Sequence, residues 1–339
     1  MEVTERVVRD GPYFEDLEVG AVYADAPVLT LTSGHAAVHQ ALTGDRLRMA
    51  LDGSLCEAVT GNARPLAHPN LVCDVAIGQS TEPSQRVLGN LFYRGLVLLA
   101  PAFIGDTLAT TTEIVALKQN RPRPDGGATG LAVFRIRTVN QRGEAVLDFW
   151  RCPMIPLRDP DAATGHADGF DSIPDELDAD AVSGAVPANW DLAAYRARVP
   201  GEHFSDLIAG TTIEVAGRDT VTAAPELARL TLNVAGAHTD AGATAHGRRL
   251  VYGGHTISVA AAQATRALPN LVTILAWKRC EHLAPVFEAD VLQTELTIEG
   301  ARELRGEGGL ADLRARVSAE REGGEVEPVL DWSFVALLA

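Results

Sequence analysis

Apolar and polar residues alternate at every second position in two groups of segments, and this pattern predicts half-buried β-strands. The segments are 108–115, 131–139 and 145–150 in the first half of the chain, and 291–298, 313–317 and 329–332 in the second. Stretches with helical patterning precede each group. The chain is therefore expected to contain two units with the same order of elements: an extended segment, two helices and a run of strands.

The segment 253–268 differs from an ordinary surface helix, because its residues are small on nearly every face. Other parts of the chain can approach such a helix closely, so we expect it to be enclosed. A strand-rich unit with one enclosed helix predicts an α+β fold, in which an antiparallel sheet wraps around a central helix.

Three short sequences occur twice in the same order, which indicates a tandem duplication. The repeated pairs are 14–20 with 204–210, 99–106 with 283–290, and 146–150 with 329–333, at offsets that drift only from 190 to 183. An acidic, turn-rich stretch separates the copies. We therefore expect an N-terminal copy over 1–157, a linker over 158–189 and a C-terminal copy over 190–339.

Composition narrows the classes of function. The chain has 339 residues, 46% of them hydrophobic, and a formal net charge of −16, which argues against nucleic acid as a partner. Four scattered cysteines without a CxxC pair predict free thiols in a reducing cytoplasm. The charged N-terminus does not resemble a signal peptide, and no apolar stretch is long enough to span a membrane. The sequence leaves open whether the protein forms a homo-oligomer.

Candidate chemistry gathers in the C-terminal copy. The stretch 233–240 holds Asn233, His238 and Asp240, and two glycines, Gly253 and Gly254, stand where the small-residue helix begins. The first N–H groups of a helix have no intrahelical acceptor, and glycine lets a ligand atom approach them. Such groups suit an oxyanion hole for a carbonyl that gains negative charge. A plain tight turn before a helix is the alternative.

The N-terminal copy lacks these groups at the corresponding positions. At an offset of 184, Pro69 and Asn70 stand opposite the two glycines, and at an offset of 188, Asp45 and Ala50 stand opposite the candidate amide and imidazole. Proline has no N–H to donate. We therefore expect one active centre, in the C-terminal copy, with the N-terminal copy as a scaffold or a wall of the cleft.

Five motifs resemble those of the MaoC-like, (R)-specific enoyl-CoA hydratases in double hot-dog form: 13–20 (YFEDLEVG), 89–95 (GNLFYRG), 105–112 (GDTLATTT), 117–120 (LKQN) and 247–255 (GRRLVYGGH). The last four are similar to the mesaconyl-CoA hydratases, also called β-methylmalyl-CoA dehydratases. The resemblance covers nearly the whole chain except the linker. It implies two tandem antiparallel sheets, each wrapped around a central helix, and a hydro-lyase that acts on a CoA thioester without a metal or redox cofactor.

The family pattern is an aspartate and, after four intervening residues, a histidine, which together hold the water that adds across the C2–C3 double bond. By this resemblance His238 takes the histidine position, whereas Asn233 replaces the aspartate. An amide orients water but cannot accept its proton. The resemblance therefore implies His238 as the acid/base and Asn233 as the water holder, with Asp240, or Asp45 from the other copy, as a carboxylate in reserve.

The same region offers groups for the rest of the substrate. Arg248 and Arg249 suit the phosphates of coenzyme A or a free acyl carboxylate, because arginine binds both as a planar fork. Tyr252, His255 and Lys118 are further binding candidates, with solvation or packing as the plainer roles of the last two. The expected reaction is the reversible conversion of β-methylmalyl-CoA to mesaconyl-CoA and water. A hydratase of another enoyl-CoA, a hot-dog thioesterase and a non-catalytic acyl-CoA-binding subunit stay open as alternatives.

Overall fold

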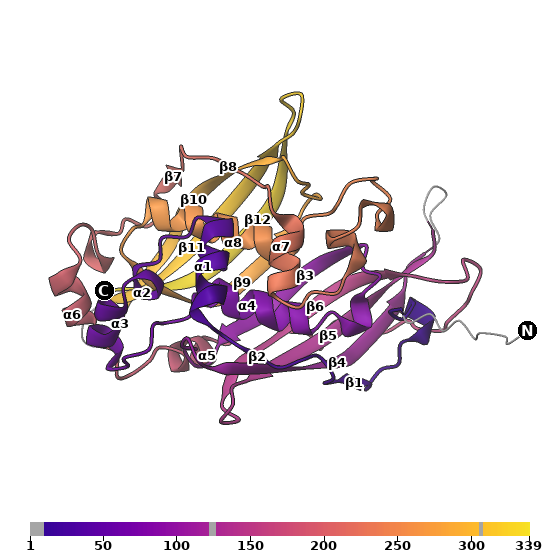
Figure 1. The fold of residues 1–339 in the computed structure, drawn as a ribbon, viewed down its shortest axis with the longest axis horizontal. Coiled ribbons are helices and arrows are strands. Elements are labelled where there is room, and N and C mark those ends of the chain that lie inside the picture. The colour runs from indigo at the N-terminus through magenta and orange to yellow at the C-terminus, as the bar shows by residue number, and fades with distance from the viewer. Residues whose placement is uncertain (1–9, 122–126, 305–307) are drawn as a thin grey trace, which may run out of the picture.

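The computed structural model describes residues 10–121, 127–304 and 308–339. Within these residues, strands pair antiparallel in one continuous sheet with the order β1-β4-β5-β6-β3-β9-β12-β11-β10-β7 (Figure 1), and β2 and β8 pair with β4 and β10. The strands are β1 (Val22–Tyr23), β2 (Leu29–Thr30), β3 (Gly89–Leu98), β4 (Thr107–Gln119), β5 (Thr129–Val139), β6 (Ala145–Pro156), β7 (Thr212–Glu214), β8 (Asp219–Thr220), β9 (Leu271–His282), β10 (Val291–Glu303), β11 (Gly309–Glu320) and β12 (Val326–Leu338).

Helices precede the long strands in each half, as the patterning predicts. The α-helices are α1 (Ser33–Thr43), α2 (Arg48–Leu51), α3 (Gly53–Thr60), α4 (Pro69–Gln79), α5 (Ala179–Gly184), α6 (Leu192–Arg198), α7 (Ala224–Leu230) and α8 (Gly253–Ala267). Short 3-10 helices are η1 (Phe14–Asp16), η2 (Glu82–Ser84), η3 (Phe204–Asp206), η4 (Gly236–His238) and η5 (Ala241–Ala243).

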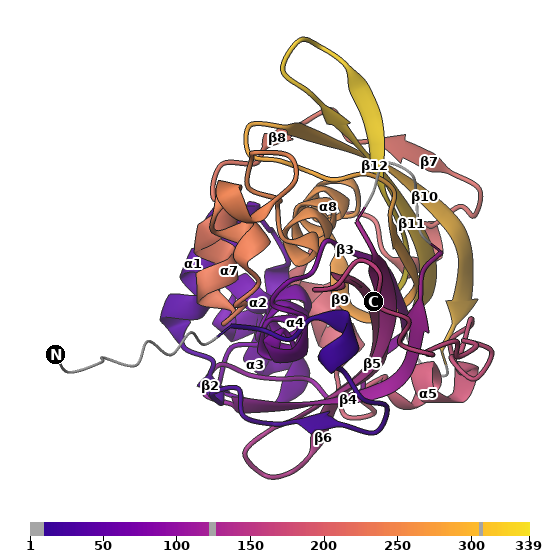
Figure 2. The same ribbon diagram turned by 90° about the vertical axis from the view of Figure 1, so that its right-hand side faces the viewer.

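The two halves repeat one architecture, in which a curved sheet surrounds a central helix. Figure 2 shows α4 of the first half and α8 of the second half side by side inside the sheet, and the two helices contact each other. Every residue of α4 is buried, and α8 is buried from Gly254 to Thr265. This arrangement confirms the predicted α+β fold with a helix enclosed by each half of the sheet.

The sheet does not break between the halves. Strand β3 pairs with β9 through Tyr93 opposite Cys280 and Val97 opposite Ala276. A single apolar cluster includes residues of both central helices and the large side chains of Phe149 and Trp332. The two copies therefore share one core, and a cavity between them is held by both.

The segment 158–189, expected to be a linker, packs against both halves. It contains α5 and buries Ile173, Val182 and Ala185. Val182 and Ala185 join an apolar cluster with Val97 of β3 and Leu275 of β9. Part of this segment therefore contributes to the core.

Cys56, Cys73, Cys152 and Cys280 are buried free thiols, in agreement with the sequence. Among the described residues, no helix combines the length and the apolar character that crossing a membrane would require.

Candidate active site

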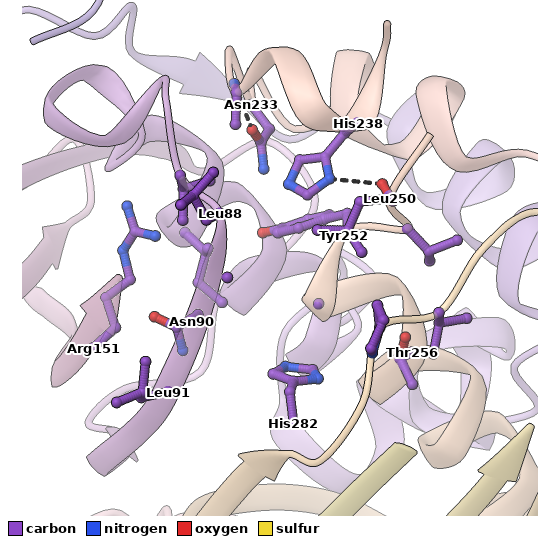
Figure 3. A pocket seen from close by; sticks show the side chains of 18 of the residues that line it. Leu88, Asn90, Leu91, Arg151, Asn233, His238, Leu250, Tyr252, Thr256 and His282 are labelled. Atoms are coloured by element: carbon purple, nitrogen blue, oxygen red, sulfur yellow. Dashed lines mark hydrogen bonds between the residues drawn. The ribbon is translucent and has the colours of Figure 1, made fainter. Parts of the chain in front are cut away.

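A cavity of about 360 Å³ lies between the halves at the N-terminus of α8. The first half supplies the end of α4, the start of β3 and Arg151 of β6 (Figure 3). The second half supplies Asn233, His238, the turn that precedes α8, and the end of β9. Within the described residues that line it, the cavity has no aspartate or glutamate.

His238 ends η4 and turns its imidazole into this cavity. Nδ1 donates a hydrogen bond to the carbonyl of Leu250 at 2.8 Å, so in the neutral ring the lone pair is on Nε2. The side chain packs against the ring of Tyr252, with centroids 5.5 Å apart, and the residue is 6% exposed. The pKa of His238 is lowered to about 4, because burial, with a smaller contribution from the charge of Arg151, outweighs the opposing hydrogen bond to the Leu250 carbonyl. The ring is therefore a neutral base at physiological pH.

Asn233 lies beside this imidazole and presents a donor to the cavity. Its Oδ1 accepts the backbone N–H of Ala235 at 3.0 Å, which leaves the Nδ2 amine as the free end of the amide (Figure 3). The preceding residue, Leu232, has a φ of 61°, in the left-handed region. The turn rests on the first half, because the N–H of Val234 donates to Thr81 Oγ1 at 3.1 Å.

The two glycines at the start of α8 face different neighbours. Gly253 lines the cavity, and within the described residues its N–H has no acceptor. A Cβ on Gly253 would lie 2.7 Å from His282 Nε2, and one on Gly254 would lie 2.0 Å from Asp74 Oδ1. Gly253 therefore offers the free N–H to a ligand, whereas Gly254 allows close contact between the two central helices.

His282, the last residue of β9, also lines the cavity, although it is not among the residues predicted from the sequence. Its Nε2 is buried without a hydrogen-bond partner, and desolvation lowers its pKa to about 4. The signal was present in the duplication, since the offset of 184 that aligns the repeats places Leu98 opposite this histidine. This difference between the copies, a histidine opposite a leucine, was the signal that the sequence offered.

Arg151 was missed in the same way. Its side chain is 3% exposed, and Nη2 donates to the Ser80 carbonyl at 2.7 Å and to Ser84 Oγ at 2.8 Å. It shares the inward face of β6 with Leu147 and Phe149, because alternate residues of a strand point the same way. An arginine in an inward-facing position was the available signal.

Several predicted residues lie outside the cavity lining. Asp240 is exposed and its Oδ1 accepts the N–H of Gly242 as a cap of η5. Arg249 pairs with Glu288, and Arg248 packs over Phe287 at 4.7 Å. Both arginines line a separate recess of about 250 Å³.

The remaining predicted binding residues divide between the cavity and other places. Lys118 of β4 lies over Phe170, and His255 is buried inside α8. Tyr252 does line the cavity, and its hydroxyl donates to the Asp74 carbonyl at 2.9 Å.

The equivalent region of the N-terminal half is filled. A remnant of about 20 Å³ is lined there by Ala185, Pro187 and Trp190 from the segment after β6. The other lining residues include Leu66, Ala67, Pro69, Val72, Leu98, Pro101 and Ala102. At the offset of 184 these seven correspond to cavity residues Leu250, Val251, Gly253, Thr256, His282, Pro285 and Val286.

Asp45 of the N-terminal half has a histidine partner that the repeat offsets did not reveal. His68 caps α4, accepts the Asn70 N–H on Nδ1 at 3.0 Å, and places Nε2 2.9 Å from the Asp45 carboxylate. Burial raises the pKa of Asp45, but the charge and hydrogen bond of His68 and the Leu47 N–H outweigh it, so the net shift is downward. Asp45 is thus engaged within its own half, away from the cavity lining.

A buried neutral imidazole next to a free helix N–H suits proton transfer at a carbon activated by a carbonyl, which is the chemistry of an enoyl-thioester hydratase. In the described residues, no cluster of three or more His, Cys, Asp or Glu side chains could hold a metal ion. That the reaction needs no cofactor stays a prediction.

Comparison with known proteins agrees with this class. No protein-family model matches the chain. Mesaconyl-CoA hydratase of Cereibacter sphaeroides is 31% identical over 322 residues, which cover 93% of this chain and 91% of that protein. β-Methylmalyl-CoA dehydratase of Chloroflexus aurantiacus is 28% identical over 356 residues, with 97% of each chain covered. A conserved hypothetical protein of Mycobacterium tuberculosis with a double hot-dog fold is 50% identical, with a TM-score of 0.88 over 97% of this chain and 99% of that one.

The fold is therefore the double hot-dog, as predicted, and the protein is a hydro-lyase of CoA thioesters. The chain belongs to the MaoC-like hydratase and dehydratase family that includes the mesaconyl-CoA hydratases.

Proposed function

We propose that this protein catalyses the reversible hydration of mesaconyl-CoA to β-methylmalyl-CoA. The observation that carries the proposal is the free Nε2 of His238 in one cavity with the unpaired N–H of Gly253. The names of the two full-length relatives supply the acyl group.

In the dehydration direction, one base serves both proton transfers. His238 Nε2 takes the C2 proton, and the thioester carbonyl, which becomes an enolate, accepts the Gly253 N–H. The enolate then re-forms the carbonyl as the C2–C3 double bond forms and the C3–O bond breaks. The imidazolium returns its proton to the departing hydroxyl, which leaves as water. No separate carboxylate base is needed, so Asp240 and Asp45 take no part in this scheme.

Asn233 supports this step as a donor. Because Oδ1 accepts the N–H of Ala235, the amide Nδ2 group faces the cavity and donates to the oxygen of the water or hydroxyl. An aspartate with the same contacts would present a second acceptor there. The amide therefore holds the water and leaves the proton to His238.

In the bound substrate, the coenzyme A moiety would extend out of the cavity along the turn that precedes α8. Leu250 and Val251 line the cavity, and Arg248 and Arg249 precede them at the surface recess. We assign the phosphates to Arg248, whose side chain is 48% exposed, with Arg249 held beside it by Glu288. Tyr252 orients the His238 ring by contact.

The test follows the absorbance of the conjugated thioester when purified protein is mixed with mesaconyl-CoA, with a thiol reagent in parallel to detect free coenzyme A. Loss of the conjugated double bond without thiol release is expected. His238→Ala should lower kcat by about 100-fold or more, and His35→Ala, at the start of α1, is the matched control. Thiol release would indicate a thioesterase, and ligand binding without turnover would indicate a binding subunit.

A further inference from the structure

The charge of the cavity comes from one residue that the mechanism above does not use. Among the described residues that line the cavity, Arg151 is the single lysine or arginine. The lining contains no aspartate or glutamate, although the chain as a whole carries a net charge of −16. A cavity with this composition attracts an anion.

Arg151 is buried without an anionic partner. Its guanidinium contacts two neutral oxygens through Nη2, and within the described residues no carboxylate lies within ion-pair distance of it. Its Nε is buried with no hydrogen-bond partner. Burying an unpaired charge typically costs several kcal/mol, so a structure that keeps one at a cavity wall favours a ligand that neutralises it.

The guanidinium is also held rigidly. Ser80 and Ser84, which accept its hydrogen bonds, are themselves fully buried, and the ring of Phe134 lies 5.3 Å from its Cζ. The charge lies close enough to His238 to lower the pKa of that imidazole. The arginine and the candidate base therefore act on the same small volume, which can hold an acyl group.

The duplication shows that this charge is particular to one cavity. The offset of 183 that aligns the last repeated motif places Phe334 opposite Arg151, and Phe334 stacks on Trp332 at 4.0 Å in the core. The other arginines near the site are engaged elsewhere: Arg249 pairs with Glu288, and Arg248 donates to the Glu288 carbonyl.

We propose that Arg151 binds the free carboxylate of a dicarboxylic acyl-CoA and thereby sets the substrate class of the enzyme. In mesaconyl-CoA the carboxylate is attached to C3, the carbon that gains the hydroxyl. An acyl chain with its thioester at Gly253 and its carboxylate at Arg151 would present C2 and C3 to His238. This inference rests on the proposed hydratase function, and it adds the residue that distinguishes charged from neutral acyl groups.

The first test compares two non-reactive inhibitors of the wild-type protein, succinyl-CoA and butyryl-CoA. Their acyl groups have the same length and differ in a carboxylate against a methyl group. Succinyl-CoA should bind at least tenfold more tightly, measured by isothermal titration calorimetry. Equal affinities would overturn the proposal. This measurement needs no variant and no turnover, so it remains decisive if the proposed reaction fails.

The second test uses Arg151→Gln and Arg151→Lys with mesaconyl-CoA and with crotonyl-CoA, a neutral enoyl thioester that has a methyl group in place of the carboxylate and lacks the C2 methyl group. Arg151→Gln should lose about 100-fold in kcat/KM on mesaconyl-CoA and less than about fivefold on crotonyl-CoA, because truncating a buried charge contact is expensive only when the ligand is charged. Arg151→Lys should recover part of the loss.

Arg137→Gln is the control for both variants, since Arg137 is a half-exposed arginine of the neighbouring strand β5, paired with Glu113 at 3.6 Å. It should leave both substrates unaffected. An equal loss on both substrates would assign Arg151 a purely structural role, and no loss on either would remove it from the site. If neither Arg151 variant folds, the inhibitor pair decides.

Discussion

Replacing Gly253 by proline removes one N–H from the candidate oxyanion hole and leaves the helix start in place. Tyr252, the residue before it, has φ −57° and ψ 132°, and His68, which precedes Pro69 at the start of α4, has φ −56° and ψ 131°. The backbone of the C-terminal copy is thus already compatible with a proline at the first helical position. Since the Gly253 N–H has no acceptor in the described part of the chain, the replacement breaks no hydrogen bond there.

The expected loss can be separated from the effect of the added side chain. Any Cβ at this position approaches His282 Nε2 to 2.7 Å, so the ring must shift in every variant. Gly253→Ala introduces the same Cβ but keeps the N–H. Removing one oxyanion donor typically costs about 100- to 1,000-fold in kcat, or about 3–4 kcal/mol. The ratio of kcat between the alanine and proline variants should therefore be about 100 or more.

The assay is steady-state hydration of mesaconyl-CoA, with thermal melting of each variant to show that it is folded. Because proline restricts the unfolded chain, the melting temperature of Gly253→Pro should be no lower than that of Gly253→Ala. A folded proline variant whose kcat stays within about threefold of the alanine variant would refute the assignment of the oxyanion donor.

Other consequences concern the second histidine, acid stability and the strained turn. His282→Leu, which introduces the residue of the N-terminal copy, should raise the free energy of unfolding by about 1–2 kcal/mol because it removes an unpaired buried nitrogen, and lower kcat/KM; a lower melting temperature would contradict this. Burial lowers the pKa of His238, His255 and His282 to about 4. In the unfolded chain their pKa values are near 6.5, so between pH 6.5 and pH 4 the unfolded state binds more protons than the folded state. The free energy of unfolding should therefore fall as the pH drops from 6.5 to 4, by about 3 kcal/mol per histidine at pH 4. Urea unfolding at pH 7, 5.5 and 4.5 measures this, and a constant free energy would refute it. Leu232→Gly should gain about 1 kcal/mol by relieving the left-handed φ of 61°; lost stability in the same urea assay would show that packing outweighs the strain.

The fold was predictable because its sequence signals are local and occur in both copies of the duplicated unit. Alternation located six of the eight long strands that the structure describes, and the small residues of 253–268 identified the helix enclosed by the sheet. It did not locate β3 and β9, because burial does not alternate regularly along these two central strands. The repeat offsets also distinguished Gly253 from Pro69 at the two helix starts. These inferences need only neighbouring residues and one comparison between copies.

The site was only partly predictable, because its remaining members depend on contacts between distant segments. Arg151 lies one residue beyond a predicted strand, and its role depends on the turn after α4, which holds its guanidinium. Arg249 is paired by Glu288, 39 residues later in the chain. The repeat offset of 188 places Ala50, not a histidine, opposite His238, so it predicts no histidine near Asp45. The structure nevertheless has a buried histidine–aspartate pair in the N-terminal copy, because His68 at the start of α4 contacts Asp45.

The arrangement of the acyl group can be measured directly in a crystal structure of the protein with succinyl-CoA. The account predicts the thioester oxygen within hydrogen-bond distance of the Gly253 N–H, the C2 atom next to His238 Nε2, and the carboxylate on Arg151. An acyl group bound beside Pro69, or bound in the cavity with its thioester away from Gly253 and His238, would contradict the account.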